Sequence, residues 1–172
     1  MAALEIALRV LLGAVFGVAF GSKARSRAAF LDFAASLGDI GWLRGRSRSV
    51  AALAIPALEV GTVALLAVPA TAAWGFAAAA ALLTAFTAVT GRELARGRRV
   101  RCRCFGAGTA QIGRPQIARN IVLLAGSVAG LLAGPASHGG VSAPGLVYAV
   151  GLALLAATAL VRWDDLVYVV RP

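Results

Sequence analysis

The sequence predicts an all-α integral membrane protein, a single domain over residues 1–172 built as a bundle of about five transmembrane helices. Hydrophobic residues make up 60% of the chain and the mean hydropathy is +0.84, well above the range of soluble domains. Only 14% of residues are charged, and these charges gather between long apolar runs. This distribution is typical of a chain that crosses a membrane several times.

The first predicted span covers residues 4–20. The run lacks both the basic start and the small-residue cleavage site of a signal peptide, so we expect it to be retained. Gly13, Gly17 and Gly21 follow one another at intervals of four residues. Small residues repeated in this way are expected to let a neighbouring helix approach closely.

The next two spans are predicted at residues 50–68 and 72–90, joined by a tight turn into a helical hairpin. Before them, residues 22–49 carry six basic side chains. An amphipathic stretch at residues 28–37 lies within this basic segment and is expected to form a short interfacial helix that ends near Gly38.

The last two spans are predicted at residues 117–133 and 145–161, after a loop at residues 91–116 that carries both cysteines of the chain. With five spans, the basic segments at residues 22–49 and 91–119 lie on the same side of the membrane. The positive-inside rule places that side in the cytoplasm and the N-terminus outside. We therefore expect a multi-pass protein of the cell membrane with its cysteines on the cytoplasmic face.

The net charge of +10 raises the question of nucleic-acid binding, because clustered arginines neutralise phosphates. However, 14 of the 17 basic residues fall in the two segments that flank membrane-length apolar runs. Their placement is explained by topology and by contact with anionic lipid headgroups. We predict membrane lipid, and no nucleic acid, as a partner.

The strongest local signal for chemistry is the pair Cys102 and Cys104, which lies between Arg101 and Phe105 with Arg103 in its centre. A thiolate, and not a thiol, attacks a disulfide, and the cations of Arg101 and Arg103 favour the thiolate. Two cysteines separated by one residue can close a small strained disulfide that a partner reduces readily. The pair is therefore a candidate catalytic site for thiol-disulfide exchange.

Two other interpretations of the cysteines remain open. They can be incidental, or they can be two ligands of a metal ion. A structural zinc site needs four ligands, usually Cys or His, and the single histidine, His138, is expected on the opposite side of the membrane. The sequence therefore predicts no complete metal site.

Two ionisable residues, Glu59 and Arg9, are expected inside the membrane. Glu59 lies near the middle of the second span, where a carboxylate is costly unless it has a partner or faces a polar interior. It could accept a proton from a membrane quinol, or it could form a structural bridge with Arg9 of the first span. The sequence alone leaves both roles open.

Several of these segments together resemble the MauE branch of the DoxX-like membrane proteins. The resemblance is carried by Arg9 in the glycine-bearing first span, Gly21-Ser22-Lys23 at its end, Ile55-Pro56-Ala57-Leu58-Glu59 in the second span, and Cys102-Arg103-Cys104-Phe105-Gly106 after the third. It covers about residues 5–135, and the cysteine element is its most specific part. The resemblance implies a helical membrane bundle linked to maturation of methylamine dehydrogenase alongside a thioredoxin-like partner.

The function expected from the resemblance is that of a membrane thiol-disulfide oxidoreductase or redox relay, with Cys102 and Cys104 as the redox pair. A membrane quinone near Glu59 is the candidate electron carrier. Delivery of disulfides to an exported protein would require the cysteines on the outer face, whereas the arginines place them inside. The alternative is a non-enzymatic assembly or transport factor whose cysteines bind a soft metal such as Cu(I) or Zn.

Overall fold

The computed structural model describes residues 2–40, 43, 45–97, 114–133 and 142–163. These residues form helices, and none of the described residues lies in a strand. The helices, in chain order, are α1 (Ala2–Ala24), α2 (Arg27–Ser36), η1 (Leu37–Asp39), α3 (Arg46–Ala67), η2 (Pro69–Thr71), α4 (Ala72–Ala95), α5 (Arg114–Leu132) and α6 (Ala143–Val161).

Five of these helices are long and apolar enough to cross a membrane, which confirms the predicted number of spans. Most of them extend beyond the predicted apolar run at the end where basic residues gather. Residues 91–95, expected in the cysteine loop, are in fact the last turn of α4. The reason is that an arginine can continue a helix while its long side chain reaches out to the polar layer.

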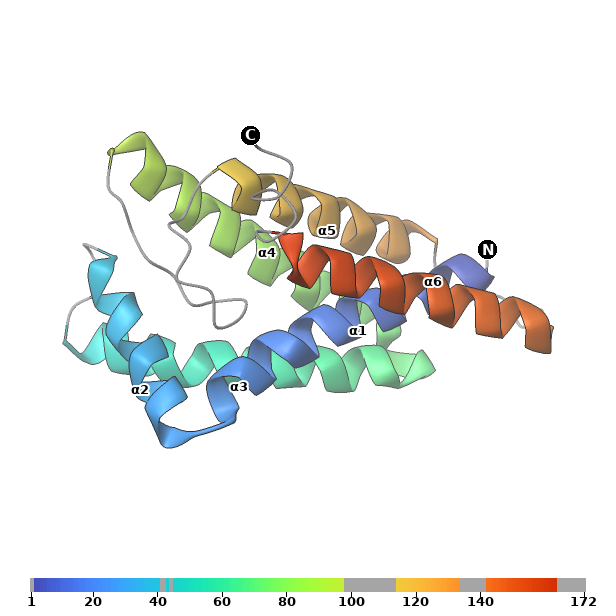
Figure 1. Ribbon diagram of the computed structural model, residues 1–172, viewed down its shortest axis with the longest axis horizontal. Helices are drawn as coiled ribbons and strands as arrows, with labels where there is room; N and C mark the ends of the chain where they lie inside the picture. Colours follow the sequence, from blue (N-terminus) through green and yellow to red (C-terminus); the bar gives the residue numbers. More distant parts are fainter. Residues whose placement is uncertain (1, 41–42, 44, 98–113, 134–141, 164–172) are drawn as a thin grey trace.

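Four of the spans, α1, α3, α4 and α5, form a closed ring in which each helix packs against the next and α5 returns to α1. The fifth span, α6, packs outside this ring against α1 (Figure 1). Buried apolar side chains from all five spans form a continuous core, including Leu12, Phe16, Leu66, Phe76, Leu83, Leu123 and Leu160.

The direction of the spans gives the bundle two different ends. At one end, called here the basic end, α1, α4 and α6 finish and α3 and α5 begin; α2 also lies there (Figure 1). The described residues of both basic segments lie at this end, as the sequence predicts. The turn between α3 and α4 lies at the opposite end.

The amphipathic segment between the first two spans forms α2 and the turn η1. Ser26 caps the start of α2, because its side chain accepts a hydrogen bond of 3.1 Å from the backbone N–H of Ala29. Phe33 and Leu37 are buried in a second apolar cluster with residues of α3 and α4, namely Ala51, Ala52, Ile55, Phe86 and Val89. The apolar face of α2 is therefore packed against the bundle.

The glycines of α1 do not have the role predicted for them. A Cβ atom built on Gly13, Gly17 or Gly21 meets no atom within 4 Å, so no described helix approaches this face closely. Close approach occurs instead at Gly75 and Gly130. A Cβ on Gly75 would lie 2.8 Å from the backbone nitrogen of Leu66 in α3, and at Gly130 it would overlap the ring of Phe76.

We expect Gly75→Ala to destabilise the bundle by about 1–3 kcal/mol, because the added methyl group collides with backbone that cannot move away easily. Gly17→Ala is the matched control, since the same methyl group there enters open space. Thermal unfolding in detergent, followed by the helical circular dichroism signal, measures both variants. Equal unfolding temperatures for the two variants would contradict the close contact between α3 and α4.

Candidate functional site

A buried ion pair joins α1 to α3. The Lys23 Nζ atom donates hydrogen bonds of 2.8 Å and 3.1 Å to the two carboxylate oxygens of Glu59. The two residues are 1% and 2% exposed. Charges in a membrane-spanning bundle are rare and usually functional or paired, and this pair satisfies the carboxylate through both of its oxygens.

The position of the Lys23 amine is determined by the geometry of the helix. Side chains on an α-helix tilt toward its N-terminus, and Lys23 folds back one turn so that its Nζ atom also donates to the carbonyl of Ala19 at 3.0 Å. The amine lies 5.1 Å from the centre of the Phe33 ring of α2, a favourable arrangement for a cation. Lys23 therefore links α1, α2 and α3 at the basic end.

The surroundings of Glu59 are otherwise apolar and closely packed. A cavity of about 10 Å³ lies beside the carboxylate, lined by Phe16, Ile55, Leu82, Leu83 and Phe86. This volume is enough for about one water molecule. The described residues around Glu59 do not provide room for a quinone ring at this position.

The bridge between Glu59 and Arg9, one of the two roles considered for Glu59, does not form, because Glu59 pairs with Lys23. Arg9 lies near the start of α1 and meets the end of α3, where its Nε atom donates to the carbonyl of Leu66 at 2.7 Å and its Nη2 atom donates to the carbonyl of Ala67 at 2.8 Å. The last carbonyls of a helix have no partner within the helix, and Arg9 satisfies two of them. Because α1 and α3 are antiparallel, Glu59 meets the end of α1 instead.

More buried polar residues lie in α4 and α5 at the basic end, and none of them was among the site residues predicted from the sequence. Thr90, Glu93, Arg119 and Asn120 are between 1% and 5% exposed. Arg96 approaches Glu93 with an Nη1 to Oε1 distance of 3.7 Å, and Arg119 donates to Asn120 at 3.5 Å. The sequence of α4 did indicate that two of them are buried. Thr90 and Glu93 continue the helical spacing of the buried apolar residues of this helix, which include Phe76, Ala79 and Leu83.

The predicted catalytic cysteines, Cys102 and Cys104, and the flanking Arg101 and Arg103, lie outside the described residues. The helices on either side of them are described. Helix α4 finishes and α5 begins at the basic end (Figure 1).

Fold and site together define a multi-pass helical membrane protein whose interior holds charged groups, among them the pair of Lys23 and Glu59 toward the basic end. The family model of the methylamine utilisation protein MauE matches residues 1–133. The chain therefore belongs to the MauE family, as its resemblance predicted. The match covers α1 to α5, and α6 lies beyond it. No curated protein and no solved structure matches the chain.

The two partners of the buried ion pair are not equivalent, which allows a test by mutation. Both hydrogen bonds that the structure gives the Glu59 carboxylate come from Lys23, whereas Lys23 also donates to Ala19. We expect Lys23→Met to cost about 3–5 kcal/mol, because it leaves a buried carboxylate uncompensated. Glu59→Gln should cost less, and the double variant should be more stable than Lys23→Met alone.

Thermal unfolding of the two single variants and the double variant in detergent gives the coupling free energy of the pair. Arg27→Gln, which removes an exposed charge at the same end of the bundle, is the control. Additive effects of the two substitutions would show that the pair does not hold α1 and α3 together.

Proposed function

We propose that this member of the MauE family is a membrane thiol-disulfide exchange protein in which Cys102 and Cys104 react with a thioredoxin-like partner. The observation that supports the proposal is that α4 finishes and α5 begins at the basic end, so the two helices that flank these cysteines in the sequence both reach this end. The family supplies the setting, methylamine utilisation. We place the protein in the cell membrane, with the basic end toward the cytoplasm.

The proposed reaction needs only two dithiol-disulfide pairs. The thiolate of one cysteine attacks a sulfur of the partner's disulfide, forming a mixed disulfide and releasing one partner thiolate, which takes up a proton. The second cysteine, as its thiolate, then attacks the mixed disulfide and releases the other partner thiolate. The partner gains two electrons, and Cys102 and Cys104 close their own disulfide; the reverse sequence reduces them.

The charges at the basic end favour this chemistry. Arg92 and Arg96 lie in and just after the last turn of α4, at the point where the chain leads toward the cysteines. A positive field stabilises thiolates and raises the encounter rate with an acidic partner. The ion pair of Lys23 and Glu59 supports the same end of the bundle by holding α1, α2 and α3 together.

Trapping of the partner tests the exchange reaction. In Cys102→Ser or Cys104→Ser, the remaining thiol has no second cysteine in the chain to resolve the intermediate. We expect one of these variants to retain a mixed disulfide with a thioredoxin-like protein, visible as a reductant-sensitive band in non-reducing gels and identified by mass spectrometry. The double Cys→Ser chain is the control. Absence of the adduct from both single variants, with Cu(I) or Zn bound by the purified protein, would favour the metal-binding alternative.

Labelling of intact cells with a membrane-impermeant maleimide after mild reduction tests the placement of the cysteines. The chain has only two cysteines, so any label reports on this pair. Because we place the basic end in the cytoplasm, we expect labelling only after the cells are permeabilised. The matched control is Ala70→Cys in the double Cys→Ser background, since Ala70 is exposed in the turn at the opposite end and should react in intact cells. Labelling of the native cysteines in intact cells would place them on the outer face.

A further inference from the structure

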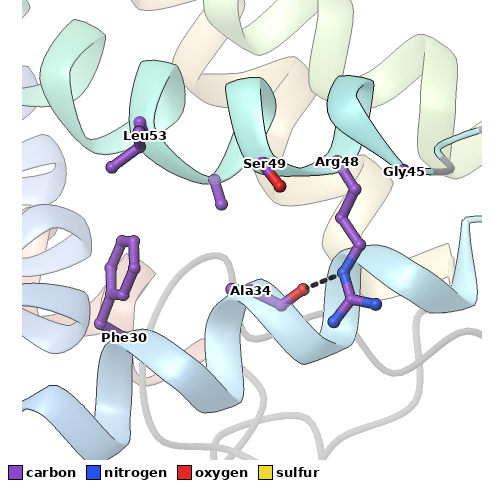
Figure 2. A pocket seen from close by; sticks show the side chains of 7 residues that line it. Phe30, Ala34, Gly45, Arg48, Ser49 and Leu53 are labelled. Atoms are coloured by element: carbon purple, nitrogen blue, oxygen red, sulfur yellow. Dashed lines mark hydrogen bonds between the residues drawn. The ribbon is translucent and has the colours of Figure 1, made fainter.

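A cavity of about 440 Å³ lies between α2 and the first turns of α3, and neither Lys23 nor Glu59 lines it. Figure 2 shows side chains of both helices that line it. The lining residues are Phe30, Ala34, Gly45, Arg48, Ser49, Ala52 and Leu53. The cavity is open to the outside of the bundle and large enough for part of a bound small molecule.

The lining changes from polar to apolar along α3. Arg48 and Ser49 lie in its first turn, and Ala52 and Leu53 follow one turn later. With a rise of about 1.5 Å per residue, Leu53 is about 7.5 Å deeper than Arg48 along the helix axis. The Phe30 ring stands on the α2 side of the cavity, facing the Leu53 side (Figure 2). The cavity therefore has a basic end at the boundary of the membrane and an apolar end within it.

Arg48 is fixed in place by the bundle. Its Nε atom donates a hydrogen bond of 2.8 Å to the carbonyl of Ala34 in the last turn of α2. Its guanidinium also packs against Gly38, where an added Cβ would lie 3.1 Å from Nη1. Within the described part of the chain, no carboxylate forms an ion pair with Arg48. Its positive charge is therefore not balanced by an acidic side chain of the described residues.

We propose that this cavity binds one anionic phospholipid, with the headgroup phosphate near Arg48 and Ser49 and an acyl chain along Phe30 and Leu53. Charge complementarity and depth favour this occupant. The polar end of the cavity lies at the basic first turn of α3, which carries Arg46 and Arg48, and Leu53 at its apolar end is 67% exposed on the outside of the bundle. Anionic lipids collect at such basic surfaces.

The test compares binding of phosphatidylglycerol and phosphatidylcholine to the full-length protein in detergent, by native mass spectrometry over a lipid titration. We expect the wild-type chain to retain one phosphatidylglycerol in preference to phosphatidylcholine. Arg48→Gln should weaken phosphatidylglycerol binding about fivefold, the effect of one basic residue at a lipid surface. Glutamine keeps an N–H donor for the Ala34 carbonyl. Arg46→Gln is the matched control, because it removes an equal charge two residues away and does not line the cavity.

A second variant, Ser49→Phe, fills the cavity from an exposed position and should abolish the retained lipid without changing the charge. The unfolding temperature of each variant shows whether the bundle is intact. Equal losses in Arg46→Gln and Arg48→Gln, or unchanged binding in Ser49→Phe, would show that the lipid is held by general surface charge and overturn the site. Equal retention of the two lipids would also overturn it. The result is independent of the cysteines and therefore of the proposed exchange reaction.

Discussion

The ion pair between Lys23 and Glu59 is the interaction on which the basic half of the bundle depends. Two opposite charges with 1% and 2% exposure can persist in an apolar surrounding only when they remain together. Separation of α1 from α3 would therefore expose an uncompensated carboxylate to the apolar interior. Because the lysine amine also faces Phe33, the same pair fixes where α2 packs.

The number of spans was predictable from the sequence because it depends on apolar run length alone. Hydropathy changes sharply at the ends of each run, and a membrane span needs a nearly constant number of residues. The helix ends at the basic end were less predictable. Lys23 and residues 91–95 look like loop in a hydropathy profile, yet their backbone is helical. Helical structure is continued by backbone hydrogen bonds, which do not require apolar side chains.

The partner of Glu59 was not predictable from spacing, because α1 offers a cation near each end. Arg9 and Lys23 are separated by about four turns, and the choice between them depends on the register of α1 against α3. That register follows from tertiary packing, including the contact of Arg9 with the end of α3. The family resemblance did point to both partners of the ion pair, since Lys23 and Glu59 each belong to a segment that carries the resemblance.

The two ends of α1 therefore have different roles that a single helix can combine. Near the start, Arg9 satisfies free carbonyls of α3 and closes the opposite end of the bundle. Near the finish, Lys23 neutralises Glu59 at the basic end, where α4 finishes and α5 begins. Both contacts join α1 to α3, so the two helices are held at two points. The basic end is therefore supported by two helices that are joined both there and at the opposite end.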